Sequence, residues 1–141
     1  MNKKLWIGFI VVFVVLVLTN FVIHGVLLAS IYHSDEMKMM IRPESEAKLW
    51  IHIVSAFITS FFFTLIFSKG YEGKGIPEGI RYGFYVGMLM SIPMAYDTYA
   101  AMPIPYSLAL QWFLYGVIQY IILGAVVAMM FGKKESTQPA H

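Results

Sequence analysis

Cysteine is absent from this 141-residue chain, and charged residues are scarce. Without cysteine the chain can form neither disulfides nor thiolate metal sites, and it has no thiol nucleophile. Charged residues make up 13% of the sequence, about half of the roughly 25% found in ordinary soluble domains. The formal net charge of +2 is too small to indicate nucleic-acid binding. The composition therefore predicts an integral membrane protein. We expect it to have the lipid bilayer as a partner and to bind no nucleic acid.

The sequence motifs of common enzyme classes are missing as well. There is no Walker loop, no G-x-S-x-G elbow, no HExxH and no GxGxxG in the sequence. The carboxylates between the first two apolar stretches follow the pattern of a solvated surface; they are Asp35, Glu36, Glu44 and Glu46. We therefore expect a protein that is not an enzyme.

Four long apolar stretches cover most of the chain, at about residues 5–32, 49–67, 76–96 and 108–131. A bilayer core of about 30 Å needs about 20 helical residues, and each stretch has about that length. Isolated strands would leave backbone groups unpaired in lipid, and the alternating pattern of a barrel is absent. We therefore predict an all-α membrane protein, a single domain over residues 1–141, with four transmembrane helices in an antiparallel up-down bundle.

Lysine and arginine predict the orientation of this bundle. With four spans, both termini lie on one side of the membrane, which holds Lys3, Lys4, Lys69, Lys74, Arg81, Lys133 and Lys134. The other side holds Lys38, Arg42 and Lys48. Because basic residues concentrate in cytoplasmic loops, we expect a multi-pass protein of the cell (inner) membrane with both termini in the cytoplasm.

Small residues recur every fourth position in the second half of the chain. They are Gly75, Gly79, Gly83 and Gly87 in the third apolar stretch and Gly124, Ala128 and Gly132 in the fourth. A face of small residues lets another helix backbone approach closely, so both sets are predicted helix-packing surfaces. The spacing fits contact inside one bundle, self-association, or a pore lined by close-packed helices.

Several polar residues fall in the outer half of the predicted membrane region. His24 and His52 are expected at similar depth because the first two helices run in opposite directions. Four more polar residues could join them from the four helices: Asn20, Ser55, Asp97 and Gln111. Ionisable residues within a span usually face the bundle interior, so we expect these six residues to form one polar cluster.

The chemistry of this cluster leaves four interpretations open. His24 and His52 could bind a haem, such as haem b, as axial ligands. They could instead hold a metal ion with Asp97 as a third ligand. A proton or solute path through a hydrated vestibule is the third interpretation. The fourth is structural, with interhelical hydrogen bonds that hold the bundle together.

A further candidate lies in the outer loop, where His33 precedes Met37, Met39 and Met40. Thioethers and imidazole are soft ligands that suit Cu(I). Methionines also seat amphipathic turns on apolar surfaces, and this second interpretation is the more common one.

The second half of the chain resembles an uncharacterised family of small bacterial four-span integral membrane proteins. The similarity covers roughly residues 70–131 and rests on Gly75 to Gly87, Met102-Pro103-Ile104-Pro105-Tyr106-Ser107, Leu110-Gln111-Trp112-Phe113 and Leu123-Gly124-Ala125. The resemblance implies four helices and a membrane location. It implies no activity and no catalytic residues.

Together these features favour a non-enzymatic membrane protein that acts through helix–helix assembly. It would be a homo-oligomer or a small accessory subunit of a larger membrane complex. The alternative is a protein that binds haem or a metal ion, or transports a proton or small solute, through the outer polar cluster.

Overall fold

The structure, a computed structural model, describes residues 2–133, and all regular structure in this range is helical. The predicted all-α fold is therefore confirmed for these residues. Four long helical stretches carry the fold: α1 (Lys3–Val22) with the π-helical η1 (Ile23–Leu27), α4 (Leu49–Gly70), α5 (Ile76–Ile92) with the π-helical η3 (Pro93–Asp97) and α6 (Thr98–Ala101), and α7 (Tyr106–Phe131). Short turns connect α1 to α4: α2 (Ala29–Tyr32), α3 (Asp35–Lys38) and the 3-10 helix η2 (Glu44–Glu46).

Three of the four stretches are long and apolar enough to cross a membrane: Lys3–Leu27 with 25 residues, Leu49–Gly70 with 22 and Tyr106–Phe131 with 26. The first ends at Leu27 rather than near residue 32, because the helix is interrupted at Leu28. The predicted span at 76–96 is helical, but it is not among these three. Glycines, tyrosines and the charged Glu78 and Arg81 dilute its apolar character.

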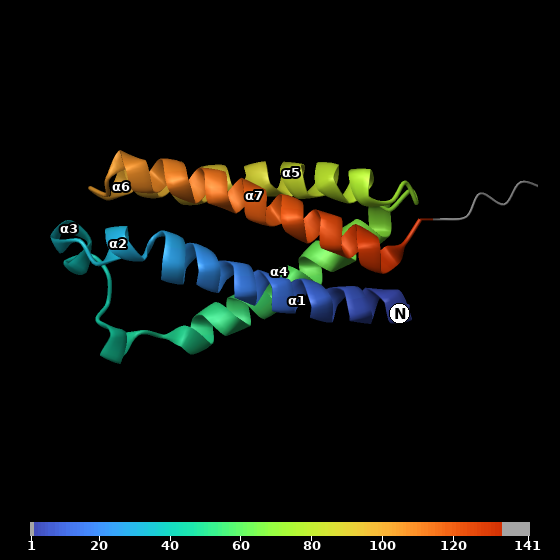
Figure 1. Cartoon of the computed structure of the whole chain (residues 1–141), viewed down its shortest axis with the longest axis horizontal. Coiled ribbons are helices and arrows are strands. Elements are labelled where there is room, and N and C mark those ends of the chain that lie inside the picture. Colours follow the sequence, from blue (N-terminus) through green and yellow to red (C-terminus); the bar gives the residue numbers. More distant parts are fainter. Residues whose placement is uncertain (1, 134–141) are drawn as a thin grey trace, which may run out of the picture.

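Consecutive long helices run in opposite directions, and the two described ends of the chain meet (Figure 1). Lys4 Nζ donates a hydrogen bond of 3.0 Å to the carbonyl of Phe131, where the C-terminal end of α7 attracts a cation. We call this end, which also holds the loop 71–75, the terminal end. The opposite end, with residues 28–48 and 102–105, is the loop end.

The backbones of α5 and α7 touch. A Cβ atom added to Gly79 would lie 2.1 Å from the carbonyl oxygen of Gly124, and one added to Gly83 would lie 2.1 Å from that of Tyr120. Ala128 also faces Gly79, since a Cβ added to Gly79 would lie 2.5 Å from the Cβ of Ala128. Small residues alone allow this approach, which runs along most of both helices (Figure 1).

The remaining predicted packing glycines occupy different settings. Gly87 lies beside α7 with more room, because its added Cβ would be 3.1 Å from Val117 Cα. Gly75 and Gly132 flank helix ends with φ of +84° and +70°. That left-handed conformation is open to glycine at little cost, so Gly75 precedes the start of α5 and Gly132 follows the end of α7, and neither packs within a helix face.

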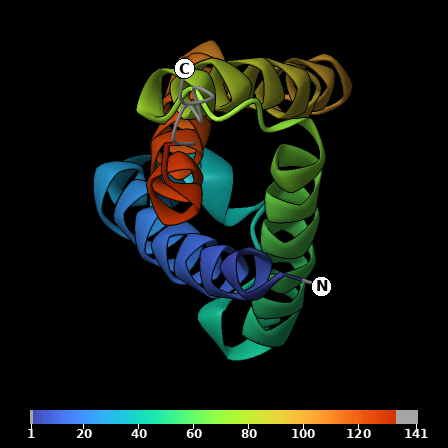
Figure 2. The same cartoon turned by 90° about the vertical axis from the view of Figure 1, so that its right-hand side faces the viewer.

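Helix α4 packs against α1 through aromatic rings in one half of its length and diverges from α1 in the other half. Figure 2 shows α7 and α4 on opposite sides of the molecule, with α1 and α5 between them. Phe9 contacts Phe57 and Phe61 with ring centroids 4.9 and 5.6 Å apart. Ala56 and the residues that follow it on the same face are buried, but His52, one turn earlier on that face, is exposed. Towards the loop end α4 therefore diverges from the other helices (Figure 1).

The α5–α7 contact predicts the effect of a single methyl group. Gly83→Ala should lower the thermal stability of the protein in detergent by about 1–3 kcal/mol, because the two backbones must move apart to relieve overpacking. Gly70→Ala is the matched control, since Gly70 ends α4 with nothing within 4 Å of the added Cβ. Equal melting temperatures for the two variants would contradict the contact.

Candidate functional site

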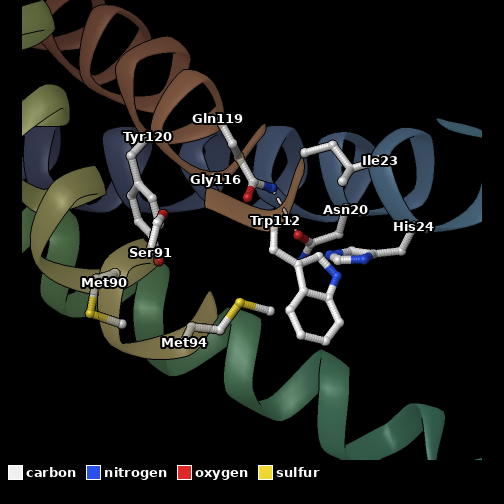
Figure 3. A pocket seen from close by; sticks show the side chains of 10 residues that line it. All are labelled: Asn20, Ile23, His24, Met90, Ser91, Met94, Trp112, Gly116, Gln119 and Tyr120. Carbon is white, nitrogen blue, oxygen red and sulfur yellow. Dashed lines mark hydrogen bonds between the residues drawn. The ribbon is translucent and has the colours of Figure 1, made fainter. Parts of the chain in front are cut away.

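A cavity of about 190 Å³ lies among α1, α5 and α7, in the half of the molecule nearer the loop end (Figure 3). Its wall combines amide, hydroxyl, imidazole, indole and thioether groups: Asn20, Ile23, His24, Met90, Ser91, Met94, Trp112, Gly116, Gln119 and Tyr120. Ser91, Gln119 and Tyr120 are buried and form its floor. Met90 and Met94 are nearly half exposed and form its rim.

One buried amide joins α7 to α1 at the cavity floor. Gln119 Nε2 donates hydrogen bonds of 2.8 Å to Thr19 Oγ1 and to Asn20 Oδ1. Thr19 in turn donates to the carbonyl of Val15 at 2.8 Å. Buried polar groups need such partners, and the need is greater in lipid, where water cannot substitute. Gln119 therefore fixes the register between α7 and α1.

The hydroxyl of Tyr32 joins two further groups of the cavity wall. Trp112 Nε1 donates to it at 2.7 Å, and His24 Nδ1 lies 2.7 Å from the same oxygen. A hydroxyl oxygen has two acceptor lone pairs, so it can accept from both the indole and the Nδ1–H of the imidazole. In that tautomer the Nε2 lone pair of His24 is available to a ligand.

Both helices that carry His24 and Met94 change to π-helical geometry at these residues. In η1 the amide of Leu28 donates to the carbonyl of Ile23, five residues earlier, at 2.9 Å. In η3 the change begins at Pro93, which has no amide hydrogen to donate. Single π-helical turns are rare and occur frequently at functional sites. Here they place one imidazole and one thioether on the wall of the same cavity.

The structure brings together only part of the polar cluster expected from the sequence. Asn20 and His24 line the cavity, whereas Gln111 is half-buried outside its wall. His52 and Ser55 are exposed on the half of α4 that diverges, and Asp97 is exposed at the end of η3. The expected convergence of all six residues does not occur, although His52 stays near enough for its charge to act on His24.

The positions of these residues decide whether the ligand sets predicted from the sequence can form. His24 lines the cavity and His52 does not, so the two are not on a common wall. Among residues 2–133, no group of three histidine or acidic side chains is placed to hold a metal ion. The set of His24, His52 and Asp97 is therefore not assembled in the structure.

The methionines of the outer loop separate as well. Met37 is 3% exposed and packs with Ile23, Leu28 and Leu108. Met39 is 89% exposed. Met40 packs against the same cluster as Met37, so the structure gives these two methionines a packing role and leaves Met39 apart.

Sequence reasoning gave too little weight to the residues that complete the site. Gln119 is an amide in the middle of the apolar α7, and Pro93 interrupts a helical stretch. Both are visible signals of a polar contact and a helix irregularity. The roles of Tyr32, Ser91 and Met94 depend on contacts between distant segments and leave no local signal.

Comparison of the chain with protein-family models, with curated proteins and with solved structures gives no match. The chemistry of the cavity is therefore the basis for the function proposed below.

The Gln119 network predicts a measurable loss of stability. Gln119→Leu should destabilise the protein by about 1–3 kcal/mol, because it leaves the Asn20 amide oxygen without its buried donor. Gln111→Leu on the same helix is the matched control and should cost less, since Gln111 lies outside the network. Thermal unfolding in one detergent compares the two, and a larger loss for Gln111→Leu would show that the network is misassigned.

Proposed function

We propose that the chain crosses the cell membrane four times, with the terminal end in the cytoplasm and the loop end outside. Helix α5 lies along α7, a helix that is long and apolar enough to span. The side of α5 away from α7 exposes large apolar residues, among them Ile80, Phe84 and Leu89, as a lipid-facing surface requires. The excess of basic residues at the terminal end supports the orientation.

We infer that the cavity is the functional site of this protein and that it binds a small ligand from the outer side of the membrane. The observation that carries this proposal is a cavity with a buried polar floor in a region where polar groups are costly. Two π-helical turns at its wall, η1 and η3, support it. The wall has one histidine and no carboxylate or lysine, which favours binding over acid–base catalysis.

The size of the cavity limits the ligand. Sites for drug-sized molecules typically enclose about 300–1,000 Å³, whereas this cavity has about 190 Å³. A haem group exceeds that volume, and the His24–His52 pair is not on a common wall. An ion or a small solute is therefore the better fit among the alternatives raised by the sequence.

Assembly with another membrane chain is a second candidate function, favoured by a different observation. His52 and Ser55 are polar residues within a span, yet both are exposed. Polar residues in spans usually face protein or water. A second copy or another membrane subunit that packs against this half of α4 would cover them. The glycines of α5 do not provide this contact, because α7 already covers Gly79 and Gly83.

Native mass spectrometry of the protein released from its own membrane tests the binding proposal. We expect one small bound species per chain, lost in His24→Leu and retained in His52→Leu. The two variants remove the same side chain, but only His24 lines the cavity. The same spectra count the chains and any second subunit in each complex.

Two results would contradict the binding proposal. One is a wild-type protein that carries no small species. The other is a species that survives His24→Leu as well as it survives His52→Leu. A monomer without partner subunits would remove the assembly candidate.

A further inference from the structure

Four side chains on the cavity wall have chemistry suited to soft cations: His24, Met90, Met94 and Trp112. Imidazole nitrogen binds copper, and thioether sulfur selects Cu(I) among the common biological metals. The face of an indole attracts a nearby cation. In Figure 3 the Met94 thioether extends towards the Trp112 indole, and the His24 imidazole lies next to that indole.

We propose that the cavity binds a soft monovalent metal ion, Cu(I) or its closed-shell analogue Ag(I). His24 Nε2 and Met94 Sδ are the ligands, and the Trp112 indole lies against the ion. The inference rests on the proposed function, because it names the ligand class of the same cavity.

The hydroxyl of Tyr32 gives this site an outer shell. Histidines that bind metals usually donate their other ring N–H to a second group, which fixes the tautomer and the ring orientation. His24 Nδ1 has that partner in the Tyr32 oxygen at 2.7 Å. The same oxygen accepts from Trp112 Nε1 at 2.7 Å, so one hydroxyl positions both the ligand ring and the indole.

The charge of the cavity wall favours a monovalent ion over a divalent one. The wall contains no aspartate, glutamate, lysine or arginine. Hard divalent ions take oxygen ligands with carboxylates among them, and within residues 2–133 no three histidine or acidic side chains are placed to hold a metal ion. Neutral ligands also leave the charge of the ion uncompensated in a membrane-embedded site, and that cost grows with the charge.

The two ligands come from the two π-helical segments. His24 lies in η1 and Met94 in η3, on helices that are separated by α4 in the sequence. The proposal therefore gives both irregular segments one shared purpose, which is to direct a nitrogen and a sulfur donor into the same space.

Titration with Ag(I), which needs no reductant, tests this site directly. The chain has three tryptophans, so Trp6→Phe with Trp50→Phe leaves Trp112 as the single fluorescent reporter. In chloride-free lipid nanodiscs we expect Trp112 fluorescence to change and to saturate at one Ag(I) per chain. Met94→Leu should weaken binding at least about tenfold, and Tyr32→Phe should weaken it by about 10–100-fold as an outer-shell change does.

Met129→Leu is the matched control, because Met129 is an exposed methionine of α7 outside the cavity wall. It should bind Ag(I) as the parent chain does. Met94 is half exposed and makes none of the hydrogen bonds described above, so Met94→Leu should keep the fold, which a melting curve checks.

The outcomes separate this inference from the proposed function. Equal Ag(I) affinity in Met94→Leu and Met129→Leu, or no response of Trp112, overturns the metal site. If the native protein then still carries another small species that His24→Leu removes, the cavity is a binding site for that species and the proposed function stands. If it carries none, both proposals fail.

Discussion

At Gly79 and Gly83 the backbone of α5 rests directly on α7, with no side chain between them. This contact sets the register of the two helices over their whole shared length. It aligns Ser91 with Gly116, where an added Cβ would lie 2.3 Å from the serine hydroxyl oxygen. It also brings Met94 and Trp112 to the wall of one cavity. The position of the candidate ligands therefore depends on glycines several turns away.

The two ends of the molecule use different interactions. At the terminal end, rings pack closely: Phe67 contacts Tyr71 and Phe131 with centroids 4.9 and 5.6 Å apart, and Tyr82 donates to the carbonyl of Phe63 at 2.7 Å. Such packing joins α4 and α5 to the rest of the helices. The ring contacts between α1 and α4 involve Trp6, Phe9 and Phe13, which lie in the half of α1 nearer Asn2. At the loop end α4 lacks this cover, and hydrogen bonds around Gln119 and Tyr32 connect α1 with α7 instead.

The sequence predicts well which residues form each helix, and it predicts poorly how the helices lie beside one another. Helix type and approximate helix ends follow from apolar length and from breakers such as Gly75 and Pro105. The four-residue spacing of Gly79 and Gly83 also puts both on one face of a helix, although it does not say which helix covers that face.

The candidate site was harder to predict for the same reason. Depth along a helix follows from counting residues, so His24 and His52 were expected together. His52 nevertheless lies outside the cavity wall, because α4 tilts away from α1 beyond the contacts of Phe9 with Phe57 and Phe61. The hydroxyl of Tyr32 joins the site only because the chain bends at Leu28, and no residue pattern near Tyr32 indicates that contact.

Cysteine labelling on both sides of α5 tests most directly whether the α5–α7 pair crosses the membrane as a unit. The chain has no cysteine of its own, so Lys74→Cys and Ala100→Cys each give one label site, both at exposed positions that flank the helix. We predict that an impermeant maleimide labels Ala100→Cys in intact cells and labels Lys74→Cys only after permeabilisation. Labelling of both cysteines from the same side would contradict it, because α5 would then not span and the cavity would not lie within the membrane between spanning helices.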